Sequence, residues 1–290
     1  LNYMPELPEV EVVKKSLESK LINLTIKSVF ISNNKLRYKI DNKQFNKIKN
    51  QKVVSIQRRS KYLLINLKKN FTILAHLGMT GKFFVIDNNK KHKTSFYYAL
   101  KKNDSKHDHI TFFFNKKIKL IYNDVRRFGF IKIYSNKSVL NSEHLAALGP
   151  EPLSSNFNLS YFDKYILNKK KKIKDLLMEQ KFVSGLGNIY CNEVLFLCKI
   201  NPAKSVKKIS HKEIKKIIKF TKKILKQAIS LGGSSIKNFS STEGEGGNFQ
   251  QKFNVYGREN AGCNRLRCLG IIKKVQSSGR ASFFCSKCQK

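Results

Sequence analysis

Four cysteines near the C-terminus have the spacing of a metal site. Cys263 and Cys268 are separated by four residues, and Cys285 and Cys288 by two. Two such pairs give Zn²⁺ four sulfur ligands in a tetrahedron with no open position, which makes the site structural rather than catalytic. We therefore predict one structural zinc ion that holds a small β-hairpin together. Four unrelated buried cysteines are the alternative.

The N-terminal stretch "MPE" carries a second chemical possibility. Pro5 directly follows Met4, and Glu6 is its neighbour. A free proline amine is a secondary amine, which attacks a carbonyl-type carbon and forms an iminium. Glu6 would then serve as a general acid or base. The alternative is an ordinary helix start, where proline and glutamate are common. We expect translation to start at Met4, or Leu1–Met4 to be removed, because an acylated Pro5 could not form the iminium.

The charge balance indicates a polyanionic partner. Lysine and arginine number 58 against 19 carboxylates, for a net charge of +39. A lysine-rich codon bias alone would not suppress carboxylates this far, and the excess is typical of nucleic-acid binding. No apolar run approaches the roughly 18 residues that cross a bilayer, and no signal-peptide core is present. We expect a cytoplasmic protein in which Cys191 and Cys198 are buried structural thiols.

Two loops combine residue types that suit a disrupted base stack. "NDVRRFGF" places Arg126 beside Phe128 between two strand-like runs, and "HLGMTG" places Met79 between glycines. A guanidinium with an aromatic ring, or an apolar wedge, fills a gap between bases. A hairpin turn and a core methionine are the alternatives. The Gly-rich turn before Asn188 is a weaker signal for an anion site at a helix N-terminus.

These residues must be positioned by two kinds of structure. Residues 5–21 have apolar side chains at helical spacing, and residues 25–134 form short runs rich in Val, Ile, Phe and Tyr. The runs predict an antiparallel sandwich or barrel. Residues 148–158 contain two prolines and predict a linker. Helical periodicity follows over 160–167, 173–180, 188–198 and 211–233, and residues 240–249 are Gly-rich.

A series of stretches resembles the bacterial formamidopyrimidine-DNA glycosylase family, in that family's order and along nearly the whole chain. They are "MPELPEVE" (4–11), "RRSKYLL" (58–64), "HLGMTG" (76–81), "KHDHI" (106–110), "RRFG" (126–129), "LGPEPL" (148–153), "GNIYCNE" (187–193), "VYGRE" (255–259) and the terminal "GRASFFCSKCQK".

The resemblance implies an α+β fold. A catalytic N-terminal β-sandwich with flanking helices would span residues 1–147, followed by a linker over 148–158. A helix–two-turn–helix DNA-binding domain would span 159–252, and a four-cysteine β-hairpin zinc finger 253–290. The implied activity is removal of oxidised purines, 8-oxoguanine and formamidopyrimidines, from double-stranded DNA by a monomer. The enzyme would then cut the abasic strand by β- and δ-elimination.

The resemblance also implies roles for individual residues. Pro5 looks like the amine that attacks C1′, Glu6 like its acid–base partner, and Lys61 like the proton-transfer lysine of β-elimination. Arg280 looks like the finger arginine that grips phosphate and is linked to δ-elimination. Residues that would fill the space of the flipped nucleotide are Met79, Arg126 and Phe128. Residues that would contact the DNA backbone are His107, Arg126, Lys169, Lys174 and Asn188. Apart from the resemblance, our hypothesis is that the Gly-rich loop over 240–249 closes over the extruded base and helps choose the lesion.

The chain departs from the family pattern at a few positions. Three residues precede Met4, the first cysteine pair is spaced by four residues where two is common, and Val125 replaces a usual proline. Two other functions stay open from sequence. One is an endonuclease VIII-like glycosylase for oxidised pyrimidines, although "PELPEVE" favours the purine group. The other is a non-catalytic nucleic-acid-binding zinc-finger protein in which Pro5 stays blocked.

Overall fold

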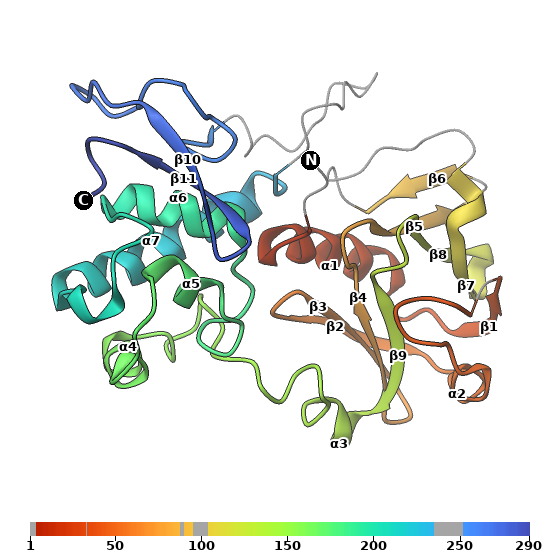
Figure 1. Ribbon diagram of the computed structural model, residues 1–290. Helices are drawn as coiled ribbons and strands as arrows, with labels where there is room; N and C mark the ends of the chain where they lie inside the picture. The colour runs from red at the N-terminus through yellow and green to blue at the C-terminus, as the bar shows by residue number, and fades with distance from the viewer. Residues whose placement is uncertain (1–3, 33, 88–89, 95–103, 235–251) are drawn as a thin grey trace. The chain divides into compact units, whose positions relative to one another are not determined.

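The computed structural model describes residues 4–32, 34–87, 90–94, 104–234 and 252–290. The chain divides into two compact units (Figure 1). Unit 1 comprises Leu1–Ala146 and Leu231–Asn248, and unit 2 comprises Ala147–Ser230 and Phe249–Lys290. The loop expected to close over a base, residues 240–249, lies outside the described residues.

Two antiparallel sheets make up the sandwich of unit 1, as the sequence pattern predicts. One sheet has the order β1 (Ile26–Ile31), β7 (Asp108–Phe114), β8 (Lys119–Asp124), β5 (Gly81–Asp87), β6 (Lys90–Lys93). The other has the order β2 (Val53–Arg59), β3 (Tyr62–Leu67), β4 (Phe71–His76), β9 (Phe130–Ser135). Apolar side chains from both sheets form one buried cluster, which is the core of this unit.

Helix α1 (Leu7–Leu21) closes one side of that core, as predicted. Its residues Val10, Val13, Leu17 and Leu21 are fully buried in the cluster. Pro8 lies in the first turn, where its missing N–H is not needed. The short helices α2 (Asn42–Asn46) and α3 (Asn136–Val139) were not predicted from sequence. They span little more than one turn, so they show no helical periodicity.

Among the described strands, the chain crosses between the sheets three times, and two of these crossings are neighbours. One crossing joins β4 to β5, and the other joins β8 to β9. Strand β4 pairs with β9, with His76 opposite Phe130, and β5 pairs with β8, with Gly81 opposite Asp124. The two crossing loops therefore run side by side. The loop around Arg126 is not a hairpin turn, because its strands belong to different sheets.

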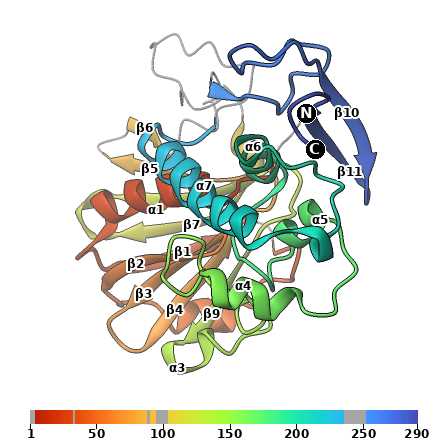
Figure 2. The same cartoon turned by 90° about the vertical axis from the view of Figure 1, so that its left-hand side faces the viewer.

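Unit 2 is a helical cluster with a two-stranded finger. Its elements are α4 (Leu159–Ile166), α5 (Ile173–Met178), α6 (Asn188–Cys198), the 3₁₀ helix Val206–Lys208, α7 (His211–Ser230), β10 (Ile272–Ser277) and β11 (Arg280–Cys285). Helix α6 is buried along most of its length and packs against α7 and β11 (Figure 2). In the described part of the chain, no helix is both long and apolar enough to cross a membrane.

The segment 148–158 packs within unit 2 rather than extending freely. The N–H of Gly149 donates to the carbonyl of Gln180 at 2.8 Å, and the N–H of Ser184 donates to that of Pro150 at 3.0 Å. A Cβ at Gly149 would lie 2.5 Å from the carbonyl oxygen of Lys181, so this contact requires glycine. Phe157 is fully buried. Gly149 and Phe157 therefore serve close packing within unit 2.

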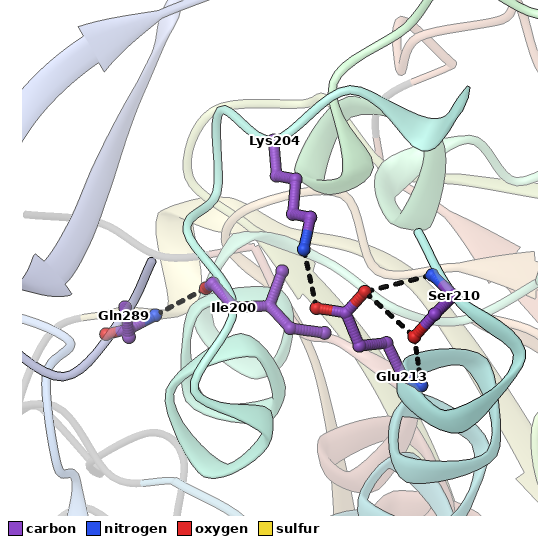
Figure 3. Close-up of polar contacts among 5 residues, drawn as sticks. All are labelled: Ile200, Lys204, Ser210, Glu213 and Gln289. Atoms are coloured by element: carbon purple, nitrogen blue, oxygen red, sulfur yellow. Dashed lines mark hydrogen bonds and ion pairs between the residues drawn. The ribbon is translucent and has the colours of Figure 1, made fainter. Parts of the chain in front are cut away.

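Two separate sets of polar contacts anchor the start of α7 and the C-terminal tail (Figure 3). Glu213 accepts from the Lys204 amine at 2.7 Å and from the N–H of Ser210 at 2.9 Å, which completes a capping box. Burial acts to raise the pKa of Glu213, but these donors lower it overall. Nearby, the Gln289 amide donates to the carbonyl of Ile200 at 2.8 Å. The C-terminal tail is thereby attached to the connection between α6 and α7.

Candidate active site and metal centre

An open cavity in unit 1 gathers the residues predicted to enter DNA. Its volume is about 520 Å³, and it lies where the two crossing loops meet the N-terminal segment. Its lining consists of Met4, Arg37, His76, Gly78, Met79, Arg126, Arg127 and Phe128. The structure therefore brings Met79, Arg126 and Phe128 together from two loops that are far apart in sequence.

The N-terminal segment leads from this cavity directly into α1. Met4 lines the cavity, Pro5 follows it and is buried, and Glu6 is the N-cap of the helix. The Glu6 carboxylate accepts the N–H of Glu9, and the Glu9 carboxylate accepts the N–H of Glu6 at 3.0 Å. Glu9 also accepts the N–H and hydroxyl of Ser234, each at 2.8 Å. This box fixes the direction in which the chain reaches Pro5.

Basic groups surround the cavity wall at His76. Burial, together with the positive charges of Lys61 and Arg37, lowers the pKa of His76 to about 3. The imidazole is therefore neutral at physiological pH. Its Nδ1 accepts the N–H of Gly78 at 3.0 Å, so the remaining proton is on Nε2. Lys61 directly precedes β3 and follows a left-handed turn at Ser60, and its charge acts on His76 in this wall.

Arg126 and Phe128 form the exposed tip of their loop. The Arg126 guanidinium lies over the Phe128 ring, 4.5 Å from its centroid, and Phe128 is 46% exposed. Stacking of this kind holds the guanidinium out toward solvent while the ring stays available to a base. Arg127 has a positive φ of 57°, which turns the chain sharply between them. The tip is thus shaped for contact with a partner rather than for the core.

His107 and Lys169 are not among these cavity residues. His107 ends the 3₁₀ helix Asp104–His107 just before β7. Lys169 belongs to unit 2 and follows α4, where its amine lies 4.5 Å from the centroid of the Tyr165 ring.

Lys174, Asn188 and Arg280 meet at the start of β11 in unit 2. Lys174 is 2% exposed, and its amine donates to the carbonyl of Ala281 at 2.7 Å and to the Ser282 hydroxyl at 2.8 Å. The Asn188 amide donates to the same Ala281 carbonyl at 3.0 Å. Arg280, the preceding residue, is exposed. Lys174 and Asn188 were expected to contact the DNA backbone. In the structure they hold the protein backbone at Ala281, next to Arg280.

The four cysteine sulfurs form the metal cluster that the sequence predicts. All four Sγ atoms lie within 4.8 Å of one another. The Cys263–Cys288 and Cys268–Cys285 pairs are 3.9 and 3.7 Å apart. Ligands at about 2.3 Å from a tetrahedral zinc ion are about 3.8 Å apart. The cluster therefore fits a structural Zn²⁺, and a Cβ at Gly270 would approach Cys285 Sγ to 2.5 Å.

The other two cysteines are buried on α6, as expected. Cys191 is fully buried and Cys198 is 3% exposed. Burial raises the pKa of Cys198 to about 12, so this thiol stays protonated. Its chemistry is that of a small packing group.

Several polar residues that shape these sites were not singled out from sequence. Arg37 lies in an irregular stretch without a pattern, and His76 was visible as the first residue of "HLGMTG". Glu193 is fully buried on α6 and accepts four N–H groups from residues 254–256. Its partners are 61 to 63 positions away, which no local signal reveals.

Comparison with known proteins agrees along the whole chain. The model of the formamidopyrimidine-DNA glycosylase N-terminal domain matches residues 4–131, and that of the formamidopyrimidine-DNA glycosylase H2TH domain matches 148–240. Formamidopyrimidine-DNA glycosylase of Rickettsia bellii is 42% identical over 287 residues, covering 99% of this chain and 100% of the relative. The protein of that name from Roseobacter denitrificans is 37% identical, with the same coverage.

Solved structures agree with the fold. Lactococcus lactis Fpg in complex with abasic-site DNA superposes with a TM-score of 0.84 at 34% identity, covering 98% of this chain and 99% of that one. A point mutant of the same Fpg, bound to DNA containing Fapy-dG, gives 0.85 at 34% identity, covering 99% and 100%. The sandwich, the helical unit and the four-cysteine finger described above are thus shared with these structures. The chain belongs to the formamidopyrimidine-DNA glycosylase family.

Proposed function

We propose that this protein removes formamidopyrimidines and oxidised purines from DNA and then cleaves the abasic strand. The observation that carries the proposal is the route of the N-terminal segment. It passes from a cavity lined by Met79, Arg126 and Phe128 straight to Pro5 and Glu6. An amine nucleophile, an acid–base group and base-stack wedges are thereby available in one unit. Family membership over the full chain supports the same activity.

The chemistry proposed for Pro5 requires that its nitrogen is not acylated. The amine attacks C1′ of the lesion nucleotide as the bond from C1′ to the base breaks, and Glu6 acts as acid–base partner on the sugar and base. Opening of the sugar ring, with a proton going to the ring oxygen, leaves an iminium between C1′ and the proline nitrogen. Lys61 then moves the proton lost in β-elimination, and Arg280 assists loss of the second phosphate. Hydrolysis of the iminium releases the proline.

The DNA itself must be opened for this reaction. A nucleotide leaves the stack at a cost of a few kcal/mol, and groups that fill the gap offset that cost. We assign this role to Met79, Arg126 and Phe128. His107 and Lys169 would hold phosphates. Lys174 and Asn188 would act on the phosphates indirectly, through the Ala281 backbone that they hold in place. The net charge of +39 supplies salt-sensitive affinity for the duplex.

The zinc finger contributes structure to this scheme. The four cysteines would hold Zn²⁺ at the base of β10 and β11, and the ion supplies folding energy to a hairpin without a core of its own. We also propose the division of the chain given above, with the sandwich over 1–147 and the finger over 253–290, and a cytoplasmic location where chromosomal DNA is accessible.

Incision of defined duplexes tests the proposal. The protein is incubated with labelled duplexes that contain 8-oxoguanine, a formamidopyrimidine, thymine glycol or a preformed abasic site. We expect cleavage at both purine lesions and at the abasic site, leaving phosphates on both sides of a one-nucleotide gap. Faster cleavage at thymine glycol would favour the oxidised-pyrimidine enzyme. Salt-sensitive binding without any cleavage would favour the non-catalytic alternative.

The Glu6→Gln variant separates the two proposed steps. If Glu6 serves the departing base, this variant loses 8-oxoguanine excision while cleavage of the preformed abasic site, which has no base to expel, continues. Glu11→Gln is the matched control on the same helix, since Glu11 pairs with Arg58 at 2.7 Å and does not line the cavity. Equal loss of both activities in Glu6→Gln would show that Glu6 acts only on the sugar and would contradict its assigned role at the departing base.

A further inference from the structure

The residues proposed to enter the DNA stack sit on two separate loops. Met79 is on the crossing from β4 to β5, and Arg126 and Phe128 are on the crossing from β8 to β9. Each loop alone is a short connection between strands of different sheets. Something must therefore hold their tips in one arrangement for both to enter the same gap.

A buried carboxylate joins the two loops. Asp124, at the end of β8, is fully buried. Its Oδ1 accepts the Thr80 hydroxyl from the other loop, and its Oδ2 accepts the N–H of Gly129 at 2.8 Å and the Tyr122 hydroxyl at 3.3 Å. Hydrogen bonds to an ionised acceptor are the stronger kind, and a dry setting increases their strength.

Thr80 extends this link to the arginine that carries the wedge function. Its hydroxyl donates to Asp124, and the hydroxyl oxygen also accepts the N–H of Arg126 at 2.9 Å. The hydroxyl of Thr80, the residue after Met79, therefore contacts Asp124 at the start of the opposite loop and Arg126 at its tip. The carbonyl of Asp124 is also engaged, because Nε2 of His109 lies 2.8 Å from it.

Glycines let the loops approach this closely. A Cβ at Gly78 would lie 2.5 Å from the backbone nitrogen of Gly129 and from the carbonyl carbon of Phe128. A Cβ at Gly129 would lie 1.9 Å from the Tyr122 hydroxyl. Such distances leave no room for side chains, so the two backbones are in direct contact. The close packing prevents either tip from moving without the other.

From this geometry we propose that Asp124 and Thr80 are positioning residues that couple the two loops, so that Met79, Arg126 and Phe128 enter the DNA as one rigid unit. The inference rests on the proposed function and deepens it. Asp124 is buried and contacts no solvent, so it acts through the loops rather than on the substrate. Because the two loops are held together before DNA binds, the wedge residues lose less conformational entropy when they enter the base stack. This favours extrusion of the nucleotide over binding to the DNA backbone alone.

Substitution of Thr80 tests the coupling with little risk to the fold. Thr80→Val keeps the shape and removes the hydroxyl, whereas Thr80→Ser keeps the hydroxyl and serves as the rescue. Asp124→Asn, alone and combined with Thr80→Val, completes a double-mutant cycle. Asp41→Asn is a charge-matched control, since Asp41 caps α2 on the Lys43 N–H and does not line the cavity.

Two substrates separate positioning from folding. Excision of 8-oxoguanine from a duplex requires the wedge, whereas cleavage of an abasic site in single-stranded DNA does not. We expect Thr80→Val to lower the duplex rate about tenfold, the scale of one lost hydrogen bond to a charged group, and to change single-strand cleavage by less than about twofold. Thr80→Ser should recover the duplex rate, and the double variant should be no slower than the slower single variant.

Equal loss of both activities in Thr80→Val would show a merely structural role and overturn the proposal, as would an unchanged duplex rate. A measurement that needs no catalysis distinguishes failure of the loop coupling from failure of the proposed function. A 2-aminopurine opposite a stable abasic analogue in a duplex reports unstacking when the wedge enters. If the wild-type protein cleaves no substrate, the coupling is still supported when Thr80→Val loses the fluorescence rise that wild type and Thr80→Ser show. The coupling is overturned when the wild-type protein, Thr80→Val and Thr80→Ser give the same fluorescence rise.

Discussion

Replacement of Glu193 by glutamine is expected to loosen the attachment of the finger to α6. The Glu193 side chain is fully buried, and each of its oxygens accepts two donors. Oε1 accepts the N–H groups of Val255 and Tyr256, each at 2.9 Å. Oε2 accepts the backbone N–H of Asn254 at 2.9 Å and its side-chain amide at 3.0 Å. This one carboxylate therefore satisfies three consecutive backbone N–H groups in the first residues of the proposed finger.

The expected loss of unfolding free energy follows from the number of donors that glutamine leaves without an acceptor. Glu193→Gln keeps the volume of the side chain but turns one oxygen into an NH₂ group, which faces two donors. The Asn254 amide can rotate to present its oxygen, so at least one backbone N–H stays unpaired. A buried unsatisfied donor costs about 1–3 kcal/mol, and the remaining bonds lose their ionic character. We expect unit 2 to lose about 2–4 kcal/mol of unfolding free energy.

The assay is denaturant unfolding of the zinc-loaded protein, combined with hydrogen exchange at the amides of residues 254–256. The exchange should accelerate locally in Glu193→Gln. Glu259→Gln is the control, because Glu259 forms an ion pair with Lys274 in which both side chains are nearly half exposed, and such pairs contribute about 0–1 kcal/mol. A loss below about 0.5 kcal/mol with unchanged exchange would refute the reasoning.

Three further outcomes follow from the structure. Gly129→Ala should abolish stable folding of unit 1 or displace its loops, since the new Cβ would lie 1.9 Å from the Tyr122 hydroxyl. Gly262→Ala is the control and should melt like wild type, because a Cβ there would have no atom within 4 Å. Equal melting temperatures for the two variants would contradict the packing. Removal of zinc by a chelator should unfold the finger and weaken DNA binding, with one zinc per chain by metal analysis; a finger that keeps its circular dichroism would count against the metal centre. His76 has a folded pKa near 3 against an ordinary 6.5, so unit 1 should lose stability as pH falls from about 6.5 toward 3, by at most about 1.4 kcal/mol per pH unit. His76→Gln should reduce that slope, and an equal slope in both proteins would disprove the assignment.

The sequence was sufficient to predict the local elements of the fold. Helix α1 was visible because Val10, Val13, Leu17 and Leu21 recur on one face, and the same side chains are buried in the structure. The long amphipathic pattern of α7 and its glycine stop were equally clear. Strand β6 could not be predicted, because its residues "KKHK" carry no apolar side chain and it pairs only with β5 among the described strands.

The candidate site was predicted in its residue types but not in its assembly. Met79 and Arg126 could be singled out from their loops, but the pairing of β4 with β9 and of β5 with β8 decides that they meet. Lys174 was expected on DNA, and its burial against Ala281 depends on a strand 107 positions away. Sequence patterns report periodicity along the chain, whereas these contacts depend on packing between distant segments.

The most direct measurement of the central claim is borohydride trapping on an 8-oxoguanine duplex, with the trapped peptide identified by mass spectrometry. We expect a covalent adduct on a polypeptide whose first residue is Pro5, with the deoxyribose bonded to the Pro5 nitrogen. Pro5→Ala, which keeps a primary amine, would test how far the ring nitrogen matters. An adduct on any lysine, or efficient strand cleavage by a chain in which Pro5 remains acylated, would show that the reactive nitrogen is not that of Pro5.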